Sequence, residues 1–220
     1  MIIKVCGMTD SDNISQVAAL GVDWIGMIFW PKSPRYVKQI NVNAGIIPDR
    51  GNLTKNKNNI QRVGVFVNDM MQNVVTRIVN YQLDMVQLHG NETPTYIQNL
   101  KATVLSGIQP KLKIIKAISV TTVADIDLYK DYEDCVDYFV FDTKCPSVGG
   151  SGQQFDWDLL QRYKGSKPFL LSGGIGPENA MQVKAFHHPQ CIGIDLNSKF
   201  EISPGIKNVE ALRQFIEQIM

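Results

Sequence analysis

Short apolar runs, rich in β-branched and aromatic residues, recur along this chain of 220 residues. Turn-forming residues bound each run, so the runs are predicted to be β-strands. The stretches between them place apolar residues three or four positions apart, which is the spacing of amphipathic helices. Eight strands are predicted in this way: Ile2–Cys6, Trp24–Phe29, Arg62–Val67, Met85–Leu88, Lys113–Ala117, Tyr138–Asp142, Pro168–Ser172 and Cys191–Leu196.

The predicted helices have recognisable ends. Asp10 is a candidate N-cap of the first helix, which carries Ile14, Val17 and Ala18 on one face and should end at Gly21. A later helix should begin at Pro177 and has an apolar face of Ala180, Val183 and Phe186. The last predicted helix has an apolar face of Val209, Leu212, Phe215, Ile216 and Ile219.

Strand and helix alternate eight times, which predicts a single (β/α)8 TIM barrel that forms one domain over residues 1–220. Residues 41–59 have little apolar period, so the helix after the second strand should be short and followed by an exposed loop. An open doubly wound sheet is the alternative. No Gly-x-Gly-x-x-Gly motif follows the first strand to support it.

Composition and charge narrow the class of protein. Hydrophobic residues make up 44% and charged residues 20% of the chain, as in a globular domain. Lys and Arg (22) balance Asp and Glu (21), so no nucleic acid or membrane partner is expected. The N-terminal residues lack the layout of a signal peptide, which favours a cytoplasmic protein. The four cysteines form no C-x-x-C pair and are expected to be free thiols.

Candidate chemistry centres on residues 139–157. An apolar strand meets a carboxylate at Asp142, and a loop with Gly149, Gly150 and Gly152 follows, with a helix start at Asp156. An acid at the end of a buried strand is how a β/α barrel places a catalytic group at its mouth. The apolar run before Asp142 should desolvate its carboxyl group and favour the neutral form.

Cys6 is a candidate base at the end of the first strand. Strand alternation puts Lys4 and Cys6 on one face, and the Lys4 charge should lower the pKa of the thiol from its reference of about 8.5. The alternative is a buried structural thiol beside a lysine, which is common for free cysteine.

Two further side chains follow predicted strands. Arg35 lies in a loop stiffened by Pro31 and Pro34, where its planar guanidinium could bind a carboxylate or phosphate; an ordinary solvated arginine is the alternative. His89 ends the fourth strand and shares its parity with Gln87, although a lone histidine is more often structural. No neighbouring His or Cys has metal-ligand spacing, so no metal is assigned.

A phosphate site is predicted after the last two strands. Gly173 and Gly174 allow backbone N–H groups to approach an anion at the start of a helix. Asp195, Asn197 and Ser198 would complete the site from the eighth strand. A glycine pair alone could also be a simple turn.

Six motifs lie in order along the chain: Lys4–Thr9 (KVCGMT), Pro31–Tyr36 (PKSPRY), Gly64–Val67 (GVFV), Val86–Gly90 (VQLHG), Gly149–Trp157 (GGSGQQFDW) and Ser172–Gly174 (SGG). In this order and spacing they resemble phosphoribosylanthranilate isomerase, an enzyme family of tryptophan (aromatic amino-acid) biosynthesis. The resemblance runs from Ile2 through Lys207, nearly the whole chain.

The resemblance implies a (β/α)8 barrel that converts N-(5-phosphoribosyl)anthranilate into 1-(2-carboxyphenylamino)-1-deoxyribulose 5-phosphate, an Amadori rearrangement that needs no cofactor. It implies Cys6 as general base and Asp142 as general acid. Arg35 would hold the anthranilate carboxylate. The phosphate would be held by Gly173, Gly174, Asn197 and Ser198, and the other expected substrate-binding residues are His89, Gly150 and Asp195.

Two features depart from the family pattern or have no assigned role. Much of the family has Ser-Ser-Gly after the eighth strand, where this chain has Asn197, Ser198 and Lys199, so either the turn binds phosphate without that glycine or Lys199 adds a charge in compensation. Cys145 lies close to Asp142 without an assigned role.

Rival functions remain open at this point. Another phosphosugar barrel enzyme, such as an epimerase or indole-glycerol-phosphate synthase, would share the phosphate site but use other acid and base residues. A phosphosugar-binding module without activity is the alternative from another class. The sequence also leaves open whether the protein is a monomer or a homodimer.

Overall fold

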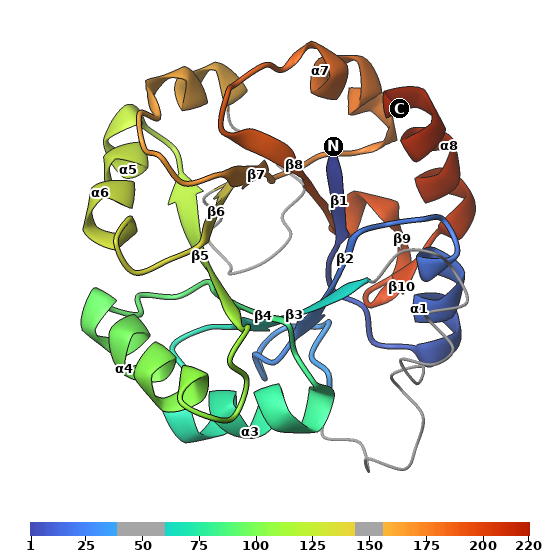
Figure 1. The fold of residues 1–220 in the computed structure, drawn as a ribbon. Coiled ribbons are helices and arrows are strands. Elements are labelled where there is room, and N and C mark those ends of the chain that lie inside the picture. The colour runs from blue at the N-terminus through green and yellow to red at the C-terminus, as the bar shows by residue number, and fades with distance from the viewer. Residues whose placement is uncertain (39–59, 144–155) are drawn as a thin grey trace.

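The computed structural model describes residues 1–38, 60–143 and 156–220. Eight parallel strands close in sequence order into a barrel, and helices surround it (Figure 1). Closure is made by β1, which pairs with β2 on one side and with β8 on the other. The predicted (β/α)8 barrel is confirmed.

The strands agree closely with the sequence prediction. Their bounds are β1 (Ile2–Val5), β2 (Trp24–Ile28), β3 (Gln61–Phe66), β4 (Met85–Leu88), β5 (Lys113–Val120), β6 (Tyr138–Thr143), β7 (Phe169–Leu171) and β8 (Cys191–Leu196). The main difference is β5, which runs three residues beyond the predicted Ala117. Ile118 and Val120 continue its alternation and pack into the core outside the barrel.

The helices and turns between the strands vary in length. They are α1 (Ser11–Ala18), α3 (Met71–Tyr81), α4 (Pro94–Leu105), α5 (Val123–Asp127), α6 (Tyr129–Tyr132), α7 (Ala180–Ala185) and α8 (Val209–Ile219), with 3₁₀ turns η1 (Trp157–Arg162), η2 (Pro177–Asn179) and η3 (Ser198–Phe200). The short helix and loop expected over residues 41–59 lie outside the described residues.

The helix ends follow the sequence signals. Asp10 caps α1, because its side chain accepts a hydrogen bond from the Asn13 backbone N–H. Gly21 follows this helix with φ +80°, a conformation that favours glycine. Pro177 starts the 3₁₀ turn η2 rather than the α-helix itself, and α7 begins three residues later. The start expected at Asp156 is also a 3₁₀ turn, η1.

An antiparallel hairpin after β8 was not predicted from the sequence. Its strands are β9 (Glu201–Ser203) and β10 (Ile206–Lys207). The turn of the hairpin contacts the loop after β1, where the Thr9 hydroxyl donates to the Gly205 carbonyl. The hairpin therefore joins the last part of the chain to the first at one end of the barrel.

Two apolar layers enclose the sheet. A large outer core packs the outward faces of the strands against the helices. A smaller inner core fills the barrel with side chains from successive strands: Trp24, Val63, Met85, Ile115, Ala117, Val140 and Leu170. Because strand side chains alternate between faces, the residue two positions after an inner-core residue also points into the barrel.

Three aspartates extend the strand pairing at the amino-terminal ends of the strands. Each lies just before an even-numbered strand, donates its backbone N–H to the preceding strand, and accepts an N–H from the same residue through its carboxylate. The pairs are Asp23 with Ile3, Asp84 with Arg62 and Asp137 with Ile114. Each aspartate thus adds one rung to a parallel pair.

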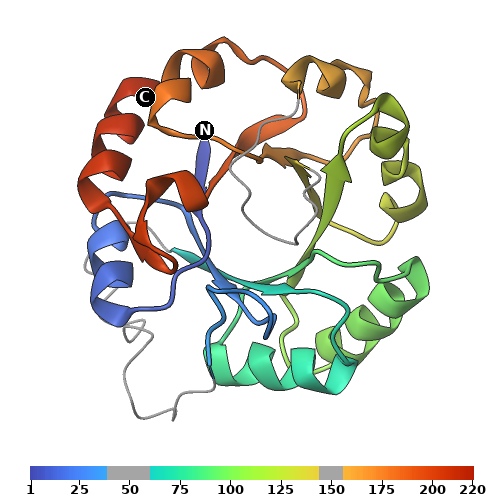
Figure 2. The same cartoon turned by 180° about the vertical axis from the view of Figure 1, so that it is seen from behind.

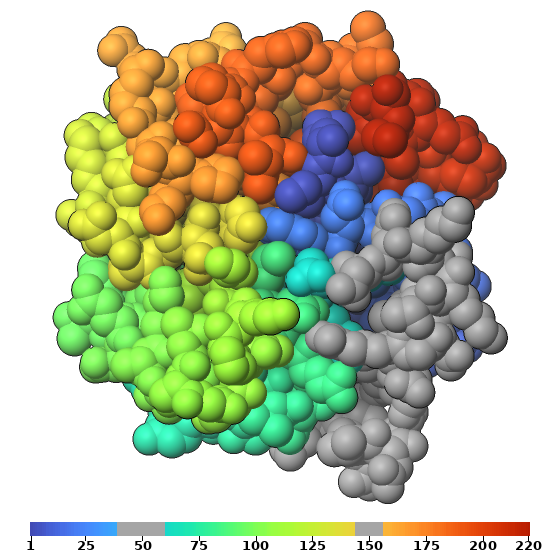
Figure 3. Space-filling view, viewed as in Figure 1, coloured from blue at the N-terminus to red at the C-terminus, as the bar shows by residue number. Residues whose placement is uncertain are grey.

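The ends of the chain lie on the same side of the barrel. The N-terminal residues sit beside segments from the last part of the chain, both in the ribbon and in the space-filling view (Figures 1 and 3). The reverse view shows the same ring of helices around the strands, with α1 next to α8 (Figure 2). None of the helices in the described residues is long and apolar enough to cross a membrane.

Barrel closure generates a test at Gly193. A Cβ atom on this residue would collide with the backbone carbonyl of Ile2, to which β8 pairs. Gly193→Ala should therefore lower the free energy of unfolding by about 1–3 kcal/mol, the usual cost of overpacking. The measurement is the urea unfolding midpoint.

Gly107→Ala is the matched control, because nothing lies within 4 Å of the added Cβ. Its midpoint should stay at or slightly above the wild-type value. Equal midpoints for the two variants would show that closure tolerates a side chain at Gly193.

Candidate active site

Strand alternation produces a polar layer above the inner apolar core. Gln87 follows Met85 by two positions, Asp142 follows Val140, and the same step leads from Leu170 to Ser172. On the strands that close the barrel, the inward positions of this layer are Lys4, Cys6 and Asp195. These residues occupy the carboxyl ends of their strands, where β/α barrels place their active sites.

Lys4 and Asp195 form an ion pair inside the barrel. The Lys4 Nζ atom lies 2.6 Å from Asp195 Oδ2, and the two side chains are 0% and 6% exposed. Burial alone would lower the pKa of Lys4, but the Asp195 charge reverses this effect and raises it. The pair links β1 to β8, the two strands that close the barrel.

Cys6 is buried next to this ion pair. A Cβ atom on Gly26 of β2 would come within 2.7 Å of its Sγ atom, so the glycine leaves the space that the thiol occupies. Burial raises the pKa of Cys6, and Asp195 raises it further, while Lys4 and Lys207 lower it. The predicted net lowering by Lys4 is therefore wrong, because burial has the larger effect and Asp195 offsets part of the Lys4 charge.

Asp142 contacts His89 across the same layer. His89 Nε2 lies 3.4 Å from Asp142 Oδ2, and His89 Nδ1 lies 3.2 Å from the Gln87 side-chain nitrogen. With the amide oriented in this way Gln87 donates to Nδ1, so the proton of a neutral imidazole is on Nε2 and faces the carboxylate. The other carboxylate oxygen accepts the Thr143 backbone N–H at 2.8 Å.

The glycine pair after β7 packs closely against Asp142. Gly173 and Gly174 have φ +88° and +70°, so both favour glycine. A Cβ on Gly173 would lie 2.6 Å from the Thr143 nitrogen and 3.1 Å from Asp142 Oδ1. The turn predicted to bind phosphate therefore also borders the predicted acid.

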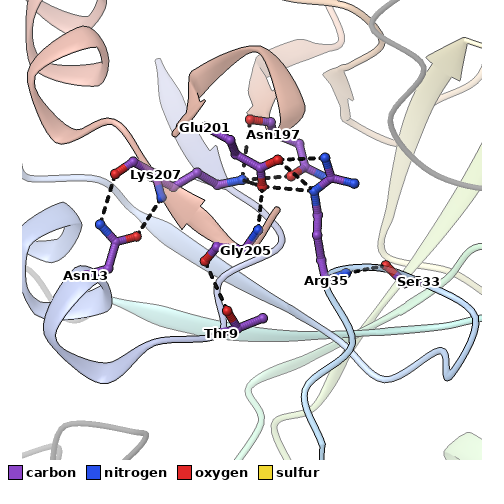
Figure 4. Close-up of polar contacts among 8 residues, drawn as sticks. All are labelled: Thr9, Asn13, Ser33, Arg35, Asn197, Glu201, Gly205 and Lys207. Carbon is purple, nitrogen blue, oxygen red and sulfur yellow. Dashed lines mark hydrogen bonds and ion pairs between the residues drawn. The ribbon is translucent and has the colours of Figure 1, made fainter. Parts of the chain in front are cut away.

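Arg35 is buried at the mouth and is paired with Glu201 (Figure 4). Its Nε and Nη2 atoms donate to the Glu201 carboxylate at 2.8 and 2.6 Å. The same carboxylate accepts the Lys207 ammonium at 2.6 Å. Arg35 is thus held by the hairpin after β8 rather than by its own proline-stiffened loop alone.

The turn after β8 lies next to this group. Lys207 Nζ donates to the Asn197 side-chain oxygen at 2.8 Å and to its backbone carbonyl at 3.3 Å. Ser198 begins η3, and the half-exposed Lys199 lies 4.0 Å from Glu178 of η2. Gly150 and Cys145 lie outside the described residues.

Three residues of this region were missed in the sequence analysis: Gly26, Glu201 and Lys207. Glu201 and Lys207 are charged residues buried in the hairpin, and no local pattern marks them, because their partner Arg35 is 166 residues from Glu201. Gly26 interrupts the apolar second strand. An isolated glycine within a strand is a signal of close approach and could have identified it.

The fold and this polar layer define a (β/α)8-barrel enzyme of the acid–base class, with a thiol and a carboxylate presented at the strand ends. The family model described as N-(5'phosphoribosyl)anthranilate (PRA) isomerase matches residues 3–218. The chain therefore belongs to the N-(5'-phosphoribosyl)anthranilate isomerase family.

Individual relatives agree with this assignment. The N-(5'-phosphoribosyl)anthranilate isomerase of Parabacteroides distasonis is 46% identical over 220 residues, covering 100% of this chain and 94% of the relative. The crystal structure of phosphoribosyl anthranilate isomerase from Thermotoga maritima has a TM-score of 0.78 at 29% identity, covering 100% of this chain and 98% of that one. A second structure, of a phosphoribosyl anthranilate isomerase in complex with reduced 1-(o-carboxyphenylamino)-1-deoxyribulose 5-phosphate, has a TM-score of 0.74 at 27% identity over the same shares.

The surroundings of Cys6 generate a pH prediction. Because the pKa of Cys6 is raised, its thiol should ionise above the ordinary thiol pKa of about 8.5. Lys4→Met removes a charge that lowers this pKa, so the ionisation of Cys6 should move to higher pH. Asp195→Asn removes a charge that raises it, so the ionisation should move to lower pH.

The measurement is the ultraviolet absorbance of the thiolate against pH for the wild type and the two variants, with Cys6→Ala as the background from the other cysteines. Circular dichroism serves as the control for folding, because removal of one partner from a buried ion pair costs about 3–5 kcal/mol. Shifts in the same direction for both variants would contradict this account of the electrostatics at Cys6.

Proposed function

We infer that this chain isomerises N-(5-phosphoribosyl)anthranilate to 1-(2-carboxyphenylamino)-1-deoxyribulose 5-phosphate in tryptophan biosynthesis. Family membership over nearly the whole chain supports this function. The observation that carries the mechanism is the placement of Cys6 and Asp142, which reach the same end of the barrel from β1 and β6. These strands are separated by β7 and β8, so a substrate can lie between the two groups.

The rearrangement needs an acid and a base on different sides of one sugar. A proton delivered to the furanose ring oxygen opens the ring and leaves a protonated imine at C1. The imine acidifies the C–H bond at C2, and a base removes that proton to form an enolamine. The enolamine then gains a proton at C1 and loses one from its C2 hydroxyl, which yields the ketone product.

In this proposal Asp142 is the general acid and Cys6 the general base. His89 positions the Asp142 side chain, because its Nε2 atom lies 3.4 Å from Oδ2, the carboxyl oxygen that does not accept the Thr143 N–H. Lys4 supports the assignment of Cys6, since its charge opposes the effect of burial on the thiol. His89 also remains a proposed substrate contact.

The remaining roles concern binding. Arg35 is proposed to bind the anthranilate carboxylate, and the turns at Gly173–Gly174 and Asn197–Ser198 to bind the phosphate. The two turns follow β7 and β8, which are neighbours in the barrel. Asp195 is proposed to accept a sugar hydroxyl, because its Oδ1 atom is buried and has no hydrogen-bond partner among the described residues.

The proposal includes the setting in which the enzyme works. A cytoplasmic location fits a mechanism that needs the Cys6 thiol reduced. The substrate is a small phosphosugar, and the protein acts as a monomer or homodimer. Gly150 is retained as a proposed substrate contact.

Replacing each proposed acid–base residue tests the mechanism. Cys6→Ala and Asp142→Asn should each lower kcat by about 100- to 10,000-fold, because each removes a proton-transfer group. The measurement is conversion of N-(5-phosphoribosyl)anthranilate, with substrate and product separated by chromatography. Asp142→Asn should still bind a reduced product analogue, since the amide keeps the shape of the carboxyl group.

Two outcomes would refute these roles. One is wild-type turnover by Cys6→Ala, and the other is a loss of analogue binding in Asp142→Asn as large as its loss of turnover. Absence of turnover by the wild-type chain would instead reject the function itself.

The role of Arg35 has a separate test. Arg35→Lys keeps a charge but loses the planar fork, and Arg35→Met loses both, so KM should rise in the first and rise further in the second, to about 10- to 100-fold. Arg213→Lys, on the exposed face of α8, is the control and should leave KM unchanged. An unchanged KM in both Arg35 variants would show that this residue does not contact the substrate.

A further inference from the structure

The hairpin formed by β9 and β10 is locked to the start of the chain (Figure 4). The Asn13 side chain of α1 makes two hydrogen bonds to the Lys207 backbone: Nδ2 donates to the carbonyl at 3.0 Å, and Oδ1 accepts the N–H at 2.7 Å. Thr9 holds the turn of the hairpin through Gly205. The side chains that the hairpin carries therefore have fixed positions relative to the β1 loop.

Glu201 is fully engaged within the protein. Its side chain is 5% exposed, and its oxygens accept from Arg35, Lys207 and the Gly205 backbone N–H. Burial alone would raise the pKa of Glu201, but its cationic partners reverse this effect and lower it. Glu201 is therefore a charged carboxylate with its acceptor positions already used, so it is suited to hold other residues and not to bind a substrate hydroxyl.

The contact with Glu201 fixes the plane of the Arg35 guanidinium. The Nε and Nη2 edge faces Glu201, and Nη1 donates to no acceptor among the described residues (Figure 4). A planar group held along one edge has no freedom to rotate, so the direction of Nη1 is set as well. The geometry leaves one edge of the guanidinium for a ligand.

Lys207 preserves the positive charge of this group. Glu201 alone would neutralise Arg35, but the two cations and one carboxylate together carry a net charge of about +1. An anionic ligand such as a carboxylate is then attracted to the free edge of Arg35. Burial lowers the pKa of Lys207, and the Glu201 charge opposes this effect, so the pairing with Glu201 favours the charged form of Lys207.

The same group reaches the turn after β8. Lys207 binds Asn197 through both its side chain and its backbone carbonyl. Gly7, next to Cys6, separates Asn197 from Arg35: a Cβ there would lie 2.6 Å from Asn197 Oδ1 and 2.7 Å from Arg35 Cδ. The residue proposed to bind the carboxylate and the turn proposed to bind phosphate are thus held by one hairpin.

We propose that Glu201 is a positioning residue that orients Arg35 toward the substrate carboxylate, with Lys207 as the cation that keeps this pair electropositive. The inference rests on the proposed function and deepens it, because it explains how a buried arginine is prepared for an aromatic acid. Glu201 acts only through Arg35 and does not contact the substrate.

Glu201→Gln tests the proposal with two substrates. The Gln amide has no negative charge and only one acceptor oxygen, so it holds the Arg35 guanidinium less firmly than Glu201 does. We therefore expect kcat/KM for N-(5-phosphoribosyl)anthranilate to fall about 10- to 100-fold, mainly through a higher KM. The second substrate is N-(5-phosphoribosyl)aniline, which lacks the carboxylate. For this substrate the variant should remain within about twofold of the wild type, because the interaction that Glu201 prepares is absent.

A coupling measurement adds a second readout. If Glu201 acts through Arg35, the double variant Arg35→Met/Glu201→Gln should be no worse than Arg35→Met alone. Glu210→Gln is the matched control, because Glu210 also accepts Nε and Nη2 of an arginine, Arg213, on the exposed surface of α8. It should match the wild type with both substrates.

The proposal would be overturned if Glu201→Gln lowered kcat/KM equally for the two substrates. It would also be overturned if the effects of Arg35→Met and Glu201→Gln on kcat/KM were additive, and Glu201 would then be a structural residue. Glu201→Asp keeps the charge and provides the same test if the amide variant does not fold; failure of both to fold would likewise assign Glu201 a structural role only. Absence of wild-type activity with the anthranilate substrate would reject the proposed function instead.

Discussion

The buried contact between Lys4 and Asp195 is the interaction on which the polar half of the barrel depends. It joins β1 to β8 at the point where the sheet closes, and both charges are almost completely removed from water. Such a pair is tolerated only when each charge has its partner, because an isolated ion in the interior costs several kcal/mol. The inner core below the pair is apolar, so the pair lies where the apolar core ends and the polar layer of the candidate site begins.

The groups around that pair divide into two sides. Asp142 and His89 lie on one side, and the charge of Asp142 raises the pKa of Asp195. Cys6 lies on the other side, with the Arg35, Glu201 and Lys207 cluster beyond it. Asp195 therefore lies between two electrostatic environments, one around the proposed acid Asp142 and one around the proposed base Cys6.

The spacing of apolar residues, and the alternation of side chains along each strand, predict most of this arrangement. The two-residue alternation places Cys6 and Asp142 inside the barrel, and the eight strands follow from the same pattern. The hairpin contacts could not be predicted in this way, because Arg35 and Glu201 are 166 residues apart in the chain. The sequence analysis predicted a lowered pKa for Cys6, whereas the structure indicates a raised one. The neighbouring lysine can be seen in the sequence, but the burial of the thiol and its closeness to Asp195 cannot.

The three aspartates that precede β2, β4 and β6 lie at the opposite end of the barrel from the site. Each joins an odd strand to the next even one, and β7 is joined to β8 there by a backbone hydrogen bond from Phe169 to Gln190. These hydrogen bonds thus fix the strand register at the face opposite the candidate site. Loops at the other face can change in length and composition without shifting the register, so the same scaffold can acquire new substrate preferences while it keeps its stability.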